Sequence, residues 1–156
     1  MDEVKLRKAK LADVKEIHRL INESARGSEV LPRSLMEIYE YLRDFTVAET
    51  AGDKTIVGCL ALHISWEDLA EIRSVVVHPE WQKQKIGRRL MESAFQEAQD
   101  LTVPRVFVLT NHPEFFKKHG FVPVQKELLP HKIWSDCLKC PKFPNCDEVP
   151  LWKKLS

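Results

Sequence analysis

The chain has 156 residues, 44% of them hydrophobic, which predicts a single globular domain over residues 1–156 with a buried core. Lys and Arg number 24 against 23 Asp and Glu, and the net charge of +1 gives no electrostatic reason to expect binding to nucleic acid or to an anionic membrane. The charged amino terminus and the apolar runs, all too short for a signal core or a membrane span, predict a cytoplasmic protein.

The amino-terminal part of the chain predicts a strand followed by two helices. Residues 4–8 alternate as a strand, and apolar residues within 11–21 recur at helical spacing. Ser34 and Glu37 then have the spacing of a capping box, which predicts the start of a second helix. Arg33 is therefore expected close to a fixed helix start.

The middle of the chain predicts three successive strands in an antiparallel meander. Residues 45–49 and 55–64 flank a Gly-Asp turn at positions 52–53, which predicts a hairpin. Residues 70–77 are rich in β-branched side chains and predict the third strand.

The second half of the chain alternates between helix and strand signals. A helix is expected over residues 86–99, a buried strand over 106–109 and a short helix over 113–119. Residues 121–128 predict extended structure, and residues 130–156 predict a loop-rich carboxyl-terminal tail with little periodicity. The element order supports an α/β or α+β fold class.

A pattern typical of an anion site lies between the third strand and the helix that follows it. The strand stops at Pro79, a polar loop follows, and a helix begins near Ile86 with Arg88 and Arg89 in its first turn. Unpaired N–H groups and the helix dipole favour a phosphate-bearing ligand at such a helix start. The alternative is an ordinary strand-to-helix turn with solvated basic side chains.

Residues 71–79, followed by Gln82-x-x-Lys85-x-Gly87, resemble the acetyl-CoA signature of the GNAT superfamily of N-acetyltransferases, whose loop reads (Gln/Arg)-x-x-Gly-x-(Gly/Ala). Residues 115–121 resemble the later aromatic-x-x-x-Gly-Phe element of the same family. The resemblance implies a mixed, mostly antiparallel central sheet flanked by helices, with acetyl-CoA as the cofactor. The implied cofactor-binding residues are Val75, Val76, Val77, Gln82, Lys83, Gln84, Lys85, Ile86, Gly87, Arg88, Asn111 and Phe116.

The phosphate loop departs from the family pattern at two positions. Lys83 and Lys85 stand where glycines usually allow a positive φ, and a lysine in the left-handed region costs roughly 1 kcal/mol. Their ammonium groups could offset part of this cost by attracting phosphates. Of the loop's glycines, Gly87 alone keeps the family residue.

The third predicted strand carries the candidate general base. Strict alternation divides this strand between two faces, with Glu71, Arg73, Val75 and Val77 on one and Ile72, Ser74 and Val76 on the other. Many members of the resembled family carry a glutamate at the aligned position that deprotonates the substrate ammonium, so the resemblance assigns this role to Glu71. Arg73, its neighbour, could hold a substrate carboxylate. From the residues alone, Glu71 is equally an ordinary exposed strand charge.

Oxyanion stabilisation and acid catalysis are implied less directly. The family uses a backbone N–H at the end of this strand, which corresponds to Val76 or Val77, to face the thioester carbonyl. Many relatives use a tyrosine as the acid at the position of Phe116, and that hydroxyl is missing here. Either the thiolate leaves unaided, or Ser74 or Cys59 serves.

A closer resemblance covers nearly the whole chain. Segments 31–34, 42–45, 58–62, 107–110 and 129–132 are similar to the acetyltransferase domain of bacterial N-acetylglutamate synthases, and the tail over 134–148 is similar to their short, stand-alone members. The implied reaction joins acetyl-CoA and L-glutamate to give N-acetylglutamate, the entry to arginine biosynthesis. Larger synthases carry an arginine-binding kinase-like domain, for which this chain has no room, so we expect no feedback control by that route without a partner.

Glutamate has two carboxylates, and each favours charge-assisted donors. The resemblance assigns Arg33 to carboxylate binding, with Arg73 and Lys132 as further candidate cations. It also places backbone groups near Leu31 and Cys59 against the remaining polar atoms of the substrate. Sequence alone favours the reading of Arg33 as a surface charge.

Three of the four cysteines lie close to the carboxyl terminus, a pattern unlike a secreted disulfide framework. Cys137 and Cys140 have ligand spacing, and Cys146 with His131 would complete a zinc site. Free thiols in a packed tail are the alternative, and we expect no metal.

Two other functions stay open. A GNAT enzyme acting on another amine, such as a different amino acid, a polyamine or a protein lysine, would keep the cofactor loop. A non-catalytic module that senses acetyl-CoA is favoured by the altered loop and the missing tyrosine. The sequence leaves the oligomeric state open, with a homodimer as one option.

Overall fold

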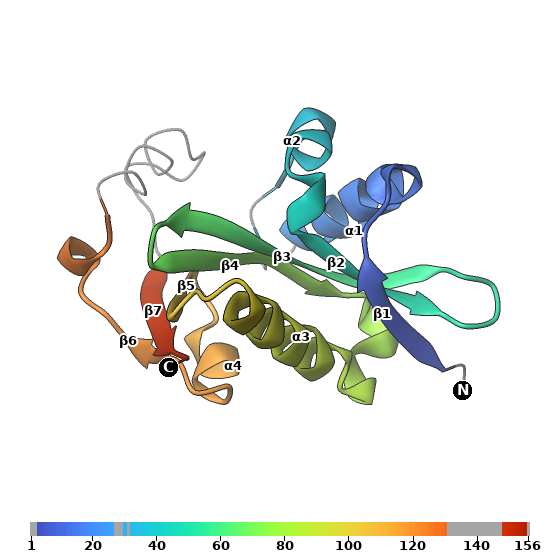
Figure 1. Ribbon diagram of the computed structural model, residues 1–156. Helices are drawn as coiled ribbons and strands as arrows, with labels where there is room; N and C mark the ends of the chain where they lie inside the picture. The colour runs from blue at the N-terminus through green and yellow to red at the C-terminus, as the bar shows by residue number, and fades with distance from the viewer. Residues whose placement is uncertain (1–2, 27–29, 31, 131–147, 156) are drawn as a thin grey trace.

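The structure is a computed structural model that describes residues 3–26, 30, 32–130 and 148–155. Its centre is a seven-stranded sheet with the order β1-β2-β3-β4-β5-β7-β6 (Figure 1). The β4–β5 pair is parallel and every other pair is antiparallel. The strands are β1 (Val4–Lys8), β2 (Phe45–Thr50), β3 (Ile56–Trp66), β4 (Leu69–Val77), β5 (Arg105–Thr110), β6 (Val122–Pro123) and β7 (Val149–Lys154).

Helices cover both faces of the sheet, which confirms the expected mixed α/β architecture. The helices are α1 (Val14–Arg26), α2 (Leu35–Glu40), α3 (Ile86–Asp100) and α4 (Pro113–Lys117). In Figure 1, α1 and α2 lie on one side of the sheet and α3 lies on the other. The apolar stripe of α3 and the apolar stripe of α1 belong to separate buried clusters, each packed against one face of the strands. No helix within the described ranges has the length and apolar character needed to cross a membrane.

Short 3-10 segments connect several of these elements. They are η1 (Leu11–Asp13), η2 (Leu42–Asp44), η3 (Pro79–Gln84) and η4 (Lys126–Leu128). The capping box predicted before α2 is present, because the Ser34 hydroxyl accepts from the Glu37 N–H and the Glu37 carboxylate accepts from the Ser34 N–H, both at 3.1 Å. The sequence prediction of this helix start is therefore confirmed.

A β-bulge interrupts β4 in the middle of the strand. Cys59 of β3 lies opposite Val76, and Ala61 lies opposite Arg73, so two steps along β3 correspond to three along β4. Ser74 lies within the bulge and has a φ of 56°, in the left-handed region. Because the extra residue shifts the register by one, it reverses the faces on which the following side chains lie.

The bulge makes the prediction of one unbroken alternation along β4 wrong. Ile72 lies in the core under α3, whereas Val76 lies in the core under α1. Val75 and Val77 pack against the α3 core, while Arg73 contacts Tyr41 at the end of α2. The strand therefore presents charged side chains to the α2 side before the bulge and apolar side chains to the α3 side after it.

The parallel strands β4 and β5 separate after a short paired region. Their pairs end at Glu71 and Phe107. Beyond this point β4 continues beside β3 to Val77, and β5 continues beside β7 to Thr110. An opening at the carboxyl ends of parallel strands is a common place for a ligand site in α/β folds.

Two predictions for the carboxyl-terminal part need correction. Within the expected extended region 121–128, the strand β6 has two residues, and residues 126–128 form η4 instead. The expected loop-rich tail contains β7 (Val149–Lys154), which pairs with β5 on one side and β6 on the other. Pro150 weakens the strand signal in the sequence, and pairing with distant partners decides the structure.

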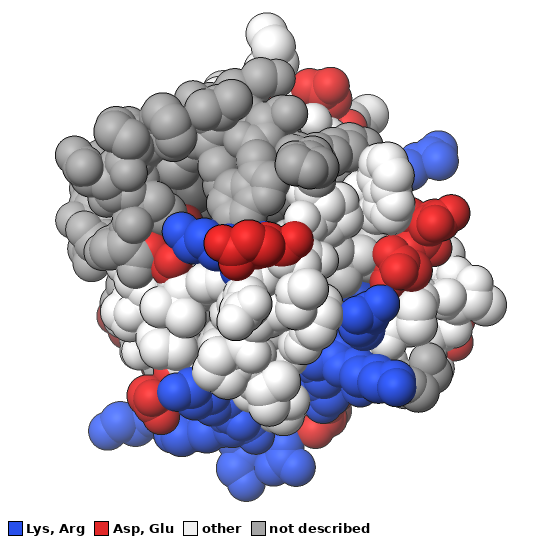
Figure 2. Space-filling model, turned by 90° about the vertical axis from the view of Figure 1, so that its left-hand side faces the viewer, with Lys and Arg blue, Asp and Glu red and all other residues white. Residues whose placement is uncertain are grey.

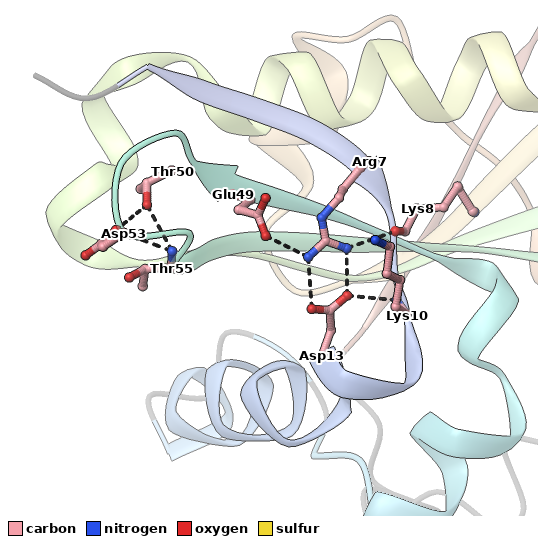
Figure 3. Close-up of polar contacts among 8 residues, drawn as sticks. All are labelled: Arg7, Lys8, Lys10, Asp13, Glu49, Thr50, Asp53 and Thr55. Carbon is pink, nitrogen blue, oxygen red and sulfur yellow. Dashed lines mark hydrogen bonds and ion pairs between the residues drawn. The ribbon is translucent and has the colours of Figure 1, made fainter.

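Arg7 connects three elements at the α1 side of the sheet. Figure 3 shows its guanidinium between Asp13 of η1 and Glu49 of β2. Arg7 donates to the two Asp13 oxygens at 2.7 and 3.0 Å and to Glu49 Oε2 at 2.7 Å. Asp13 Oδ2 also accepts from the Lys10 N–H at 2.7 Å. These hydrogen bonds lower the pKa of both carboxyl groups, and burial opposes the shift.

We expect Arg7→Met to reduce the free energy of unfolding by about 2–3 kcal/mol, because it leaves the buried Asp13 carboxylate without its charge-assisted donor. The carboxyl pKa values are lowered in the folded state, so this stabilisation is present above their ordinary pKa values and is lost as the pH falls through the folded-state values. Urea unfolding of both proteins at neutral pH and at pH values below those of the carboxyl groups measures it. A difference that stays constant toward acid pH would contradict this account.

Candidate active site

A cavity of about 620 Å³ lies where β4 and β5 separate. Its walls come from β4, β5 and α4, with the start of α3 at one end. The predicted site residues that line it are Arg33, Glu71, Arg73, Val75, Val76, Val77, Gln82, Lys85, Gly87, Arg88 and Phe116. Residues far apart in the sequence, from the loop before α2 to the end of β5, therefore meet around one space.

Several predicted site residues lie elsewhere. Lys83, Gln84, Ile86, Asn111 and Cys59 are absent from the cavity wall, and the side chain of Ile86 is buried in the core. Leu31 and Lys132 lie outside the described residues, as do the four candidate zinc ligands His131, Cys137, Cys140 and Cys146. Within the described part of the chain, no group of three or more His, Cys, Asp or Glu side chains is arranged to hold a metal ion.

Further lining residues come from β5 and α4 and were not predicted as site residues. They include Val108, Leu109, Thr110, His112, Phe115, Lys118 and His119. The sequence signal for the last three was available in the aromatic-rich segment 115–121, but which of its side chains face the cavity depends on the docking of α4 against the sheet.

The start of α3 supplies the donors for an anion. Lys85 has φ 61° and ψ 23° and precedes the first helical residue, so the N–H groups of the first turn of α3 lack partners within the helix. Gly87 lines this end of the cavity, where a Cβ would lie in ordinary van der Waals contact with the Phe115 ring, at 3.4 Å. Gln82 donates from Nε2 to the Val77 carbonyl at 3.2 Å and so fixes the loop against the end of β4.

The two lysines of the loop have different backbone conformations. Lys85 is left-handed, as expected for a position that usually holds glycine. Lys83 lies in η3 and is not among the described residues with positive φ, so the expected strain at this position is absent. Of the two arginines in the first turn of α3, Arg89 donates to the Val4 carbonyl at 2.9 Å and is directed to β1, whereas Arg88 lines the cavity.

Positive side chains gather around the end of the cavity at the start of α3. In Figure 2, Lys and Arg cluster along the lower part of the face, at the level of α3 and α4 in Figure 1. Burial lowers the pKa of His119, and the neighbouring charges of Lys153 and Arg88 lower it further. The shift favours the neutral imidazole of His119, and Lys85, Arg88 and Lys118 supply positive charge on this part of the cavity wall.

Glu71 and Arg73 lie together on β4 at the inner end of the cavity. Arg73 Nη1 lies 3.5 Å from Glu71 Oε1, and both side chains are 14% exposed. The Arg73 guanidinium also lies over the Tyr41 ring, 5.3 Å from its centroid. This cation–π contact helps to hold the guanidinium in place beside the carboxylate.

Arg33 reaches the same cavity from the loop before α2. Its backbone is fixed by Asn22, whose amide donates to the Arg33 carbonyl at 2.9 Å and accepts from the Arg33 N–H at 3.3 Å. Its Nη1 lies 3.3 Å from Glu37 Oε2. Burial opposes ionisation of Glu37, but the hydrogen bond from Ser34 and the charge of Arg33 lower its pKa. Arg33 therefore lies beside a charged partner on a preformed helix start.

The two candidates for the acid have different surroundings. Burial raises the pKa of the Cys59 thiol to about 12, and its sulfur donates to the Ser74 carbonyl at 3.4 Å within the α1 core. Ser74 lines the cavity, as does the apolar ring of Phe116. The geometry therefore favours Ser74 over Cys59.

Comparison with known proteins shows which family and which relatives the chain is similar to. The profile of the family described as "Acetyltransferase (GNAT) domain" matches residues 42–123. An uncharacterised N-acetyltransferase of Chlorobaculum tepidum is 41% identical over 96% of both chains. An amino-acid acetyltransferase of Mycobacterium tuberculosis is 40% identical over 77% of this chain and 69% of its own length.

Among solved structures, two that contain coenzyme A are similar in fold to this chain. A Mycobacterium tuberculosis protein crystallised with CoA has a TM-score of 0.84 and 31% identity, and the match covers 97% of this chain and 99% of that one. The N-acetylglutamate synthase of Neisseria gonorrhoeae, solved with coenzyme A and N-acetyl-glutamate, has a TM-score of 0.89 and 26% identity. That match covers 100% of this chain but 36% of the larger synthase.

Proposed function

Because the chain belongs to the GNAT family of acetyltransferases, we propose that it transfers an acetyl group from acetyl-CoA to the α-amine of L-glutamate. The product would be N-acetylglutamate, for arginine biosynthesis. The observation that carries this proposal is the charge arrangement of one cavity, which has phosphate donors at the start of α3 and two arginines beside a carboxylate at the other end.

The phosphate end fits the diphosphate of coenzyme A. The free N–H groups at the start of α3 provide the donors, and the small Gly87 permits close approach of the backbone. Lys85 and Arg88 add positive charge on the same wall. Acetyl-CoA supplies the activated carbonyl carbon that the substrate amine attacks.

The acceptor end fits a dicarboxylic amino acid. Glu71 is the group that removes a proton from the substrate ammonium, directly or through a water molecule. Arg73 lies beside Glu71, so it is placed for the α-carboxylate, which is adjacent to the reacting amine. Arg33 approaches from the start of α2 and is placed for the side-chain carboxylate.

Splaying of β4 from β5 leaves strand N–H groups near the reacting carbonyl. Beyond Glu71, β4 has no pairing with β5, and Val76 and Val77 line the cavity. A backbone N–H here is suited to stabilise the negative charge that develops on the carbonyl oxygen. The hydroxyl of Ser74 is the candidate group for protonating the departing thiolate.

The test of the proposed function is the initial rate of free-thiol release from acetyl-CoA with each of the twenty amino acids, and with a polyamine and a lysine peptide. We expect L-glutamate to give the highest kcat/KM, with glutamine well below it. A higher value for a different amine would replace glutamate as the substrate. Binding of acetyl-CoA without turnover of any amine would support a non-catalytic binding module instead.

We expect Lys85→Gly to increase the free energy of unfolding by about 1 kcal/mol, because glycine adopts the left-handed conformation without a Cβ penalty. The same change removes an ammonium group from the cavity, so the Kd for acetyl-CoA should rise about 3- to 10-fold. Urea unfolding and calorimetric titration measure the two effects separately. Lys83→Gly is the matched control, and it should lose stability, because Lys83 does not have a positive φ.

A further inference from the structure

An Asp-His pair lies beside the candidate general base and is not used by the mechanism above. His63 Nδ1 lies 2.6 Å from Asp44 Oδ2, and the two side chains are 23% and 21% exposed. Asp44 ends η2 just before β2, and His63 lies in β3. When Nδ1 carries the proton and donates to Asp44, the other ring nitrogen, Nε2, is an acceptor.

The same histidine is the direct cross-strand neighbour of Glu71. The β3–β4 register places His63 opposite Glu71, so their Cβ atoms are expected to lie about 4.5–5.5 Å apart on one face. Asp44 approaches His63 from the β2 side and Glu71 from the β4 side. Nε2 of His63 has no hydrogen bond to any described residue.

The ring of Tyr41 packs against the ring of His63. The two rings meet edge to face with centroids 5.0 Å apart, and the Tyr41 ring also contacts the Arg73 guanidinium. Among the described residues, the charged and titratable groups around His63 are Asp44 from η2, Tyr41 from the end of α2, and Glu71 and Arg73 from β4. The Asp44 carboxylate contacts the imidazole directly, Glu71 is its cross-strand neighbour, and the Tyr41 ring contacts both His63 and Arg73.

We propose that the Asp44–His63 pair is a proton relay that returns Glu71 to its ionised form in each turnover. The inference rests on the proposed function, because it assumes that Glu71 accepts the proton of the substrate ammonium. The ammonium loses one proton to the Glu71 carboxylate and becomes the attacking amine. The protonated Glu71 passes that proton through an intervening water molecule to His63 Nε2, and the resulting imidazolium, stabilised by Asp44, releases it to solvent.

Burial gives a reason for such a relay. Glu71 is 14% exposed and lies in a cavity that the bound cofactor and substrate would fill, so its own access to bulk water is restricted during turnover. His63 is more exposed, at 23%, and lines neither the cofactor end nor the acceptor end of the cavity. It is a positioning residue that acts through Glu71, and it does not line the cavity that the substrate would occupy.

His63→Asn tests the relay, because the asparagine amide can still donate to Asp44 but cannot carry a proton. We expect kcat at neutral pH to fall about 10-fold, with a KM for the amino acid within about 2-fold of the original. The loss should diminish at alkaline pH, where hydroxide can remove the proton from Glu71. His18→Asn, the same change on α1, is the matched control and should keep the original pH profile.

His63→Ala gives a second measurement that a purely structural role would not affect. Added imidazole should restore part of its kcat, and circular dichroism and thermal unfolding show whether each variant is folded. An unchanged pH profile in His63→Asn, or a loss of kcat that is equal at all pH values and not restored by imidazole, would overturn the relay. All assays use the best amino acid in the panel, so a substrate other than glutamate corrects the proposed function and leaves the relay test intact. Lack of turnover by the original protein would overturn both.

Discussion

Glu71→Gln is expected to lower kcat at neutral pH by about 100- to 1,000-fold, because the amide has the shape of the carboxylate but cannot accept a proton from the substrate ammonium. The KM for the amino acid should change little, since the amide keeps the volume and the hydrogen-bonding reach of the original side chain. Steady-state rates of thiol release over a range of pH measure the effect. At alkaline pH the substrate amine is already neutral in solution, so the difference between the two proteins should shrink.

The matched control for this prediction is Glu67→Gln. Glu67 lies in the exposed turn between β3 and β4, on the same hairpin as Glu71, and does not line the cavity. The control should keep its rate at every pH. If Glu71→Gln keeps the original rate at neutral and alkaline pH alike, Glu71 is not the base.

The predictable part of this fold depends on local sequence patterns. The helix start at Ser34 follows from the spacing to Glu37, and the hairpin follows from the Gly-Asp turn between two β-rich segments. The same kind of local pattern places the start of α3 at Ile86 directly after a polar loop. Each of these features depends on interactions between residues close in sequence, so the sequence of a short segment is enough to predict it.

The unpredicted part depends on contacts between distant segments. The bulge at Ser74 has no signal in a run of β-branched residues, because alternation rules assume a regular ladder and a serine with positive φ is uncommon. β7 contains Pro150 and gains its partners from strands far earlier in the chain. Ser74 lies in the cavity wall, and β7 pairs with β5, which supplies part of that wall, so the wall differs in detail from the residues predicted by resemblance.

The candidate site was predicted only in part, because some of its parts are continuous in sequence and others join distant segments. The cofactor loop is one continuous segment, and its conformation at Lys85 agrees with the family pattern that glycine usually satisfies. The Asp44–His63 pair joins residues 19 apart in sequence; Asp44 lies in the resembling segment 42–45, but nothing in the sequence links it to His63. Its relation to Glu71 depends on strand register, which the sequence could not specify once a bulge was present.

Arg33→Met is expected to lower kcat/KM for L-glutamate about 100-fold, which corresponds to about 2–3 kcal/mol for a lost charge-assisted hydrogen bond to a carboxylate. Most of the effect should appear in KM, because the side-chain carboxylate is bound equally in the ground state and the transition state. The fold should be unaffected, since Glu37 still caps α2 through Ser34. The panel of amino-acid rates, repeated with this variant, measures the change.

The comparison of glutamate with glutamine makes this prediction specific. If Arg33 binds the side-chain carboxylate, Arg33→Met should lose activity with glutamate while activity with glutamine changes far less, so the preference between them should shrink by about the same 100-fold factor. Arg33→Lys should recover part of the preference, because it restores the charge without the planar fork of donors. Arg43→Met, on the exposed side of η2, is the matched control and should keep the original preference. An unchanged KM for glutamate in Arg33→Met would exclude this arginine from substrate binding, and an equal loss with both amino acids would assign it to the α-carboxylate instead of Arg73.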